Sequence, residues 1–321
     1  MIMNVNSKII RFIRVIATIV ILLLFGIYIF FHINEFKSLL KIDPIYIILM
    51  LCLSFISMYA NASQNALLYN VLGAQVGNLE SVGISSIAAF FNLFIPQGTT
   101  IVKAVYLNHR YNIPYSKAPA FFLGILVIFL LVGSGFLLLS NMILLLMKET
   151  IPVIIWIFAI VVSFSGLLLI VDIPKTLFKK NKFINGLLAN FSEGWRELRT
   201  NKSCIIKASF YQIIIFCCSG VSMAVAYRAL GININPLFAI SFSAVYLCST
   251  ILTIIPGNLG IQESIFGVLS SQMGLAFSQG VIMSTLIRLI VLSTLFVSFP
   301  VSWYFLFYRH GIVIRKMKIS G

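Results

Sequence analysis

The residues best placed to do chemistry are lone charges inside long apolar stretches. Glu263 lies in IQESIFGVL and Lys103 in TIVKAVYL, each seven positions after a proline, and Arg288 lies in VIMSTLIRLIVL. A charge in such a stretch is costly unless it is paired, and it commonly marks a ligand pathway. We therefore expect Glu263 to pair with Arg288, either as a gate or anchor for a charged ligand or as a structural bridge.

Each proline is followed by residues that would end one helix and begin another. Residues 96–100 read PQGTT and residues 256–260 read PGNLG. Proline blocks helix continuation, and glycine lets the chain turn. A helix that restarts there presents free N–H groups and a partial positive charge to an anion such as phosphate. A capped structural kink is the alternative. The candidate binding residues at the two interruptions are Asn92, Pro96, Gly98, Thr99, Pro256, Gly257, Asn258 and Gly260.

Lys103 shares one helical face with a further cation, Arg110, because the two are seven residues apart. With Tyr106 nearby they could hold a phosphate, whereas snorkelling of both side chains to a membrane interface is the competing interpretation. Four polar residues lie within apolar runs, namely Asn61, Gln64, Asn92 and Gln212. Their setting predicts hydrogen bonds between helices.

Motifs of common enzyme classes are missing. The sequence contains no Walker loop, GxSxG, HExxH or DxD-type carboxylate pair. Its five cysteines form no CxxC pair and no Cys/His cluster, so neither a metal site nor a disulfide framework is indicated. We therefore expect no catalytic residues, no metal, no cofactor and no enzymatic activity.

The composition is that of a protein embedded in lipid. Of 321 residues, 60% are hydrophobic and 10% charged, and mean hydropathy is +1.05. A soluble domain would carry about a quarter charged residues. We predict an all-α, polytopic membrane helix bundle with six to eight spans, in which residues 1–321 form a single integral membrane domain. The clearest apolar runs are 17–31, 45–68, 121–147, 151–171, 213–230 and 281–307.

The distribution of positive charge predicts the topology. Lys8, Arg11 and Arg14 precede the first run, which has no small-residue cleavage site, so we interpret it as a retained span entered from the cytoplasm. The apolar piece 82–95 is too short to cross comfortably and precedes a basic segment. We expect this piece to dip into the membrane and return.

The loop 173–207 supports this topology, because its eight cations outnumber two acids. Cations belong on the cytoplasmic side, and the dip at 82–95 places this loop there. We predict a multi-pass protein of the cytoplasmic (inner) membrane with both termini in the cytoplasm. The formal net charge of +15 favours anionic lipid head groups as partners. Nucleic acid is disfavoured, since the basic residues are scattered through loops.

Two stretches resemble each other. Residues 86–107 read SIAAFFNLFIPQGTTIVKAVYL, and residues 243–269 read SAVYLCSTILTIIPGNLGIQESIFGVL. By the topology above they enter the membrane from opposite sides, which is typical of an inverted-topology repeat. The repeat-like halves are 44–172 and 208–307, joined by the basic cytoplasmic loop. Whether the segments around 82–112 and 237–277 are re-entrant hairpins or short crossings stays open.

At these residues the sequence resembles the transmembrane region of lysylphosphatidylglycerol synthases, a flippase-like family. The matching stretches are NLFIPQGTTIVKAVYL from Asn92, PGNLGIQE from Pro256 to Glu263, and Arg288. Asn258 stands where the family often has a second glycine. The resemblance implies a lipid translocator, and the large members also carry a cytosolic aminoacyl-transfer domain. Since this chain ends soon after its last span, we expect a stand-alone member.

We therefore predict a flippase-like protein that translocates a phospholipid or a lipid-linked polyprenyl or glycan substrate across the cytoplasmic membrane. The two hairpins would meet near the midplane and form a hydrophilic groove for the head group. The alternative is a non-transporting subunit that docks a glycosyltransferase of surface-glycan or lipid assembly. A third hypothesis, a transferase acting on a lipid-linked sugar, is disfavoured by the missing carboxylate pairs. The oligomeric state is open and includes a homo-oligomer.

Overall fold

The computed structural model describes residues 36–95, 97–115, 118–170, 200–250, 258 and 260–306. All regular structure in these ranges is helical, which confirms the predicted all-α class. The helices are the short 3-10 helix η1 (Lys37–Lys41), α3 (Pro44–Val71), α4 (Asn78–Asn92), α5 (Gly98–Tyr111), α6 (Ala118–Leu146), α7 (Val153–Ile170), α9 (Lys202–Ala229), α10 (Pro236–Ser249), α11 (Ile261–Gln272) and α12 (Phe277–Tyr304).

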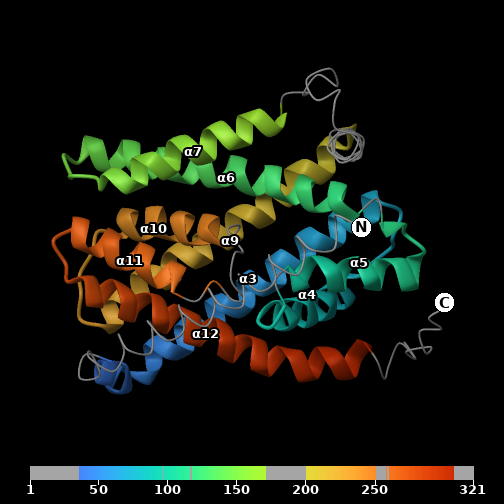
Figure 1. Cartoon of the computed structure of the whole chain (residues 1–321), viewed down its shortest axis with the longest axis horizontal. Helices are drawn as coiled ribbons and strands as arrows, with labels where there is room; N and C mark the ends of the chain where they lie inside the picture. Colours follow the sequence, from blue (N-terminus) through green and yellow to red (C-terminus); the bar gives the residue numbers. More distant parts are fainter. Residues whose placement is uncertain are drawn as a thin grey trace, which may run out of the picture.

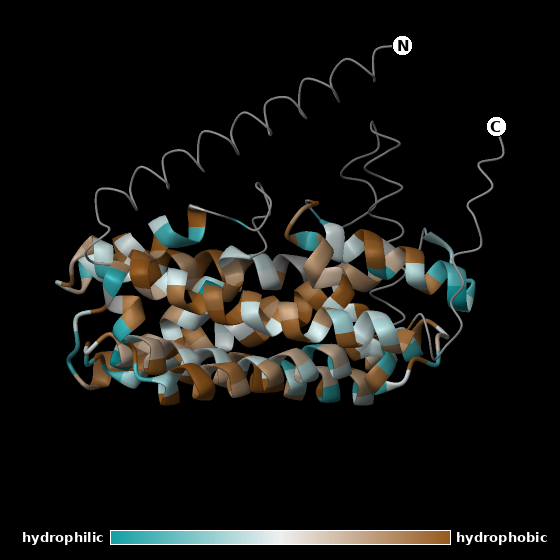
Figure 2. Ribbon diagram, turned by 90° about the horizontal axis from the view of Figure 1, so that it is seen from below, coloured by the Kyte–Doolittle hydropathy of each residue, from teal (hydrophilic) through white to brown (hydrophobic). Residues whose placement is uncertain are grey.

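Within the described ranges, four helices are long and apolar enough to cross a membrane. They are α3, residues Gly124–Leu146 of α6, α9 and α12. Shorter apolar helices cover Val153–Leu167 and Pro236–Ser249. In Figure 2 hydrophobic residues predominate along the helices, and hydrophilic residues are more frequent toward the two ends of the long axis. The expected first span at 17–31 and most of the loop 173–207 lie outside the described residues.

Local signals in the sequence determine where several helices begin. The Asp43 carboxylate accepts a hydrogen bond from the Ile45 N–H at 2.9 Å, and Pro44 occupies the first helical position of α3. The Asn235 side chain accepts from the Leu237 N–H at 3.1 Å, again just before a helix that begins with proline. Capping oxygens and an N-terminal proline both stabilise the first turn. Both helices therefore begin sharply at one end of the bundle.

The described helices occur as two sets of four with matching lengths. Helices α3, α4, α5 and α6 have 28, 15, 14 and 29 residues, and α9 to α12 have 28, 14, 12 and 28. The packing also corresponds, because α4 lies against α12 of the other set and α10 lies against α6. Helix α7 packs on α6 and α10.

Helices α3 and α9 cross at the centre of the bundle and run in opposite directions (Figure 1). The Gln64 amide of α3 donates hydrogen bonds to the Gln212 side-chain oxygen and to the Ala208 carbonyl of α9, both at 3.0 Å. This contact confirms the predicted bond between helices for Gln64 and Gln212, whereas Asn61 accepts hydrogen bonds from Asn65 within α3 itself. It also fixes the C-terminal half of α3 beside the N-terminal half of α9.

The two short helix pairs lie at opposite ends of the long axis (Figure 1). We call these ends the α4–α5 end and the α10–α11 end. Helix α4 starts near the C-terminus of α3, and α5 leads into the start of α6 at that same end. Likewise α10 starts near the C-terminus of α9, and α11 leads into the start of α12. Each short pair therefore leaves and returns at one end of the bundle.

Candidate functional site

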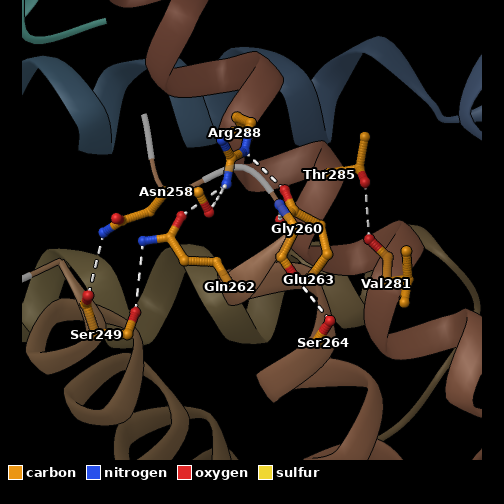
Figure 3. Close-up of polar contacts among 9 residues, drawn as sticks. All are labelled: Ser249, Asn258, Gly260, Gln262, Glu263, Ser264, Val281, Thr285 and Arg288. Atoms are coloured by element: carbon orange, nitrogen blue, oxygen red, sulfur yellow. Dashed lines mark hydrogen bonds and ion pairs between the residues drawn. The ribbon is translucent and has the colours of Figure 1, made fainter. Parts of the chain in front are cut away.

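The second interruption is built around a buried ion pair. Arg288 Nε lies 2.8 Å from Glu263 Oε1, and the two side chains are 14% and 2% exposed (Figure 3). Glu263 is in the first turn of α11, and Arg288 is in the middle of α12. The pairing expected from the sequence is therefore present. It connects the start of the short helix to the long helix that follows it.

The same guanidinium also holds the loop before α11. Arg288 Nη2 donates to the Gln262 side-chain oxygen at 3.0 Å and to the Asn258 carbonyl at 3.3 Å (Figure 3). The planar fork of arginine can hold several acceptors at once, which a lysine ammonium does less well. The acceptors are Asn258 and the first turn of α11, so Arg288 ties Asn258 to the start of that helix.

Asn258 and Gly260 supply the unusual backbone of this loop, with φ of 50° and 80°. Asparagine tolerates the left-handed region better than most residues, so Asn258 can stand where the family often has glycine. The Asn258 side chain donates to the carbonyl of Ser249, the last residue of α10, at 3.2 Å and so connects the start of α11 to the end of α10 (Figure 3). The Gly260 N–H donates to Glu263 Oε2 at 2.7 Å, which caps α11. Pro256 and Gly257 lie outside the described residues.

The first interruption uses its glycine for close packing. The left-handed residue is Gln97, with φ of 61°, whereas we expected Gly98 to provide the turn. A Cβ on Gly98 would lie 2.8 Å from the Phe91 backbone and 2.9 Å from the Asn92 nitrogen. Gly98 is therefore needed because α5 starts directly against the end of α4. Pro96 lies outside the described residues.

Lys103 is buried on α5, with 5% of its surface exposed. Its Nζ donates to Asn65 Oδ1 at 3.3 Å. The Asn65 amide nitrogen donates to the Asn61 carbonyl at 2.7 Å and to the Asn61 side-chain oxygen at 3.0 Å. Ser85 of α4 lies 3.5 Å from that same nitrogen. Helices α3, α4 and α5 thus form a polar cluster around one buried cation.

Arg110 does not join this cluster, so the structure does not bring Lys103 and Arg110, which share a helical face, into one site. Arg110 Nε lies 3.4 Å from Glu80 Oε1, and the Tyr106 hydroxyl donates to the same oxygen at 2.6 Å. The Tyr111 hydroxyl donates to the Glu80 carboxylate at 2.9 Å. Glu80 lies in the first turn of α4, so its carboxylate attracts the donors at the end of α5 and ties the two helices together.

The Glu80 carboxylate keeps the Tyr111 hydroxyl in its neutral, hydrogen-bond-donating form. Burial, followed by the hydrogen bond to the Glu80 carboxylate, raises the pKa of Tyr111 above the ordinary phenol value. Charging the phenol beside a carboxylate is unfavourable. Tyr111 therefore stays neutral at physiological pH, and the contact with Glu80 holds the outer ends of α4 and α5 together.

Two further candidates occupy the first interruption without joining a polar cluster. Thr99 donates its hydroxyl to the Ala88 carbonyl at 3.4 Å, so it links α5 to α4 and does not cap its own helix. Asn92 is half-buried as the last residue of α4, and its side chain makes no hydrogen bond within the described ranges.

Comparison with known families identifies the chain. The profile described as "Lysylphosphatidylglycerol synthase TM region" matches residues 12–298. The chain belongs to the lysylphosphatidylglycerol synthase transmembrane-region family. No match was found among curated proteins or among solved structures. The family assignment supports a membrane-embedded protein with a role connected to lipid.

The matched region contains both interruptions and the charged residues beside them, Lys103, Glu263 and Arg288. In the described part of this family member, no group of three His, Cys, Asp or Glu side chains is placed to hold a metal ion. The described side chains around the interruptions make hydrogen bonds and one ion pair.

Sequence reasoning missed Asn65, Glu80 and Gln262, which complete the clusters of this family member. Glu80 was the most detectable, since the chain has only eight acidic residues. Glu80 precedes Arg110 by 30 residues, and helical periodicity does not predict a pairing between residues of two different helices. Asn65 and Gln262 gave no signal beyond a polar residue near apolar ones.

Proposed function

We propose that this chain is a flippase-like protein that moves the head group of a phospholipid, or of a lipid-linked polyprenyl or glycan substrate, across the cytoplasmic membrane. The observation that carries the proposal is the burial of Lys103 and Glu263 beside two interrupted helix pairs in an apolar bundle. Ionisable residues within membrane bundles usually line a pathway or pair with one another. Membership of the lysylphosphatidylglycerol synthase family supports a role with lipid.

In this proposal α4–α5 and α10–α11 are re-entrant hairpins that enter from opposite leaflets. Each pair leaves and returns at one end of the bundle, and the order of long and short helices occurs twice. Both features support an inverted-topology repeat, a common plan of transporters. Interrupted helices are tolerated at membrane depth where protein or a wet cavity satisfies their backbone.

The α4–α5 end faces the cytoplasm in this arrangement. The exposed cations Arg110, Lys202 and Lys207 lie on the helix segments that meet there. Positive residues are retained on the cytoplasmic side, and the eight cations of the loop 173–207 support this assignment, although Lys37, Lys41, Lys148 and Arg228 lie at the other end. The head group would pass between the polar clusters of the two hairpins while the acyl chains stay in lipid.

Reconstitution of the purified chain into liposomes tests the transport function. Liposomes carry a phospholipid with a fluorescent head group, and a membrane-impermeant reductant bleaches the outer leaflet. A second set carries a polyprenyl phosphate with the same label. With active protein, the bleached fraction should exceed the outer-leaflet share measured in protein-free liposomes, since inner-leaflet probe becomes accessible.

Glu263→Gln combined with Arg288→Gln tests the second interruption. This pair of changes removes both charges and should slow lipid movement, because the loop loses the contacts that shape it. Lys148→Gln combined with Glu149→Gln is the matched control, since it removes one exposed cation and one exposed anion in the α6–α7 connection. Equal rates in the two double variants would remove Glu263 and Arg288 from the pathway.

The competing hypothesis predicts a different result. A non-transporting subunit would leave the bleached fraction at the protein-free value for both probes. It would also bring down a glycosyltransferase in stoichiometric amounts when purified from its native membrane. That combination of results would replace the flippase proposal.

A further inference from the structure

The two buried charges at the interruptions differ in what neutralises them. Each lies seven residues after the proline of its interruption. Glu263 has Arg288 at 2.8 Å. Lys103 has only the neutral Asn65 oxygen at 3.3 Å, and within the described ranges no carboxylate lies at ion-pair distance from it. The positive charge at the first interruption therefore lacks the carboxylate partner that Arg288 has at the second.

The ammonium of Lys103 also has unused hydrogen-bonding capacity. A lysine ammonium carries three N–H donors. The contact with Asn65 uses one of them, so two donors remain without an acceptor in the described part of the chain. Burial of a charge with so few partners is costly, and such a group usually acquires a counter-ion or a ligand.

The neighbouring amides leave this ammonium without a counter-charge. Asn65 directs its nitrogen to two oxygens of Asn61, which leaves its own oxygen facing Lys103. The amide therefore accepts from the lysine and adds no negative charge. Asn61 is exposed on α3, whereas Asn65 is 1% exposed. The cluster thus extends from the buried ammonium to the surface of the bundle.

We propose that Lys103, together with Asn61 and Asn65, binds the phosphate group of the transported lipid at the first interruption. This inference rests on the proposed transport function, and it names the substrate class as phosphate-bearing lipids. Anionic phosphate oxygens would accept from the two unused donors of Lys103 in charge-assisted hydrogen bonds. A lipid without a phosphate offers no such anion. Phospholipids and polyprenyl phosphates share this group.

Equilibrium binding to the solubilised full-length chain tests the site without requiring transport. The probes are dioleoylphosphatidylglycerol, a polyprenyl monophosphate and the phosphate-free dioleoylglycerol, each measured by native mass spectrometry. Lys103→Met keeps the length and apolar character of the side chain. It should weaken binding of a phosphate-bearing probe by about tenfold or more, because charge-assisted hydrogen bonds are lost. Binding of dioleoylglycerol should not change.

Lys207→Met is the matched control, since it removes an exposed lysine of α9 and should bind all three probes like the unmodified chain. A loss restricted to one phosphate-bearing probe supports the site and identifies the phospholipid or the polyprenyl phosphate as the source. Unchanged binding of both by Lys103→Met overturns the proposal. An equal loss for dioleoylglycerol overturns it too, because the effect would then concern the acyl chains.

A second variant keeps the lysine. Asn65→Asp places a carboxylate where the Asn65 oxygen lies, so an internal anion neutralises Lys103 and competes with phosphate. Phosphate-lipid affinity should fall in this variant as well, and unchanged affinity overturns the proposal even if Lys103→Met fails to fold. Phosphate-dependent binding without lipid movement in liposomes would leave this site standing and reject the transport function. If Lys103→Met and Asn65→Asp both keep lipid movement and lipid binding unaltered, the phosphate site is rejected and the transport function stands.

Discussion

At the residue scale, both carboxylate oxygens of Glu263 are engaged. One faces Arg288 and the other accepts from the Gly260 N–H. Arg288 in turn holds Gln262 and Asn258. Charges buried in this way contribute little net stability as a pair, but removal of one partner leaves the other uncompensated. The two residues are therefore expected to depend on each other.

Glu263→Gln should lower the free energy of unfolding by about 3 kcal/mol, because Arg288 then stays charged without a carboxylate beside it. Addition of Arg288→Gln should restore part of that loss. Thermal unfolding of the purified protein in one detergent measures both changes. Glu149→Gln removes an exposed carboxylate and serves as the control. If Glu263→Gln and Glu149→Gln unfold at the same temperature, the ion pair is unimportant for stability.

At the element scale, helices α11 and α12 come unusually close. A Cβ added to Gly280 of α12 would overlap the Phe266 carbonyl oxygen and lie 2.5 Å from the Ser270 hydroxyl. Gly267 of α11 similarly faces the Phe277 ring, at 2.5 Å from an added Cβ. Small residues permit such approach between membrane helices. This contact holds α11 on α12 near the α10–α11 end and so supports the Glu263–Arg288 pair.

Gly280→Ala should therefore destabilise the protein by about 1–3 kcal/mol, since the obstacle is backbone that cannot rotate away. Gly135→Ala in α6 is a suitable comparison, because an added Cβ there meets nothing within 4 Å. Alanine favours helix over glycine, so this control should be neutral or more stable. Detergent-solubilised melting temperatures measure the difference. Equal melting temperatures would refute the tight contact.

At the scale of the whole molecule, contacts far apart in sequence define the two ends. Cys204 near the start of α9 lies 3.7 Å from the Leu67 carbonyl near the end of α3. A Cβ on Gly83, in the first turns of α4, would contact the Leu306 side chain at 2.9 Å. The ends of α3 and α12 and the starts of α4 and α9 thus gather together. If this end faces the cytoplasm, every connection between helices has a predicted side.

Single cysteines introduced into a variant whose native cysteines are replaced by alanine test this arrangement. Positions His109 and Lys202 should react with a membrane-impermeant maleimide from the cytoplasmic side. Positions Lys148 and Arg228 should react only from the opposite side. All four side chains are exposed, so burial does not limit labelling. Labelling of His109 and Arg228 from the same side would contradict both the bundle and the proposed hairpins.

Much of this architecture follows from the sequence alone. Apolar runs, capping residues and prolines act locally, so the all-α membrane class and the interruptions before Gly98 and Gly260 could be predicted. A lone acid and a lone base in apolar surroundings also made the pairing of Glu263 with Arg288 predictable, because few partners exist in such a chain. The family motifs around these residues pointed the same way.

The partners of the remaining polar residues were decided by tertiary packing. Lys103 meets Asn65, 38 residues away, and Arg110 meets Glu80, 30 residues away. Helical periodicity describes one helix at a time, so it grouped Lys103 with Arg110. In the structure each of these side chains contacts a residue of a different neighbouring helix. Which faces of α3, α4 and α5 meet depends on close contacts such as that of Gly98 with the Phe91 backbone. Those contacts, and not the spacing of charges, leave one buried cation without an anion.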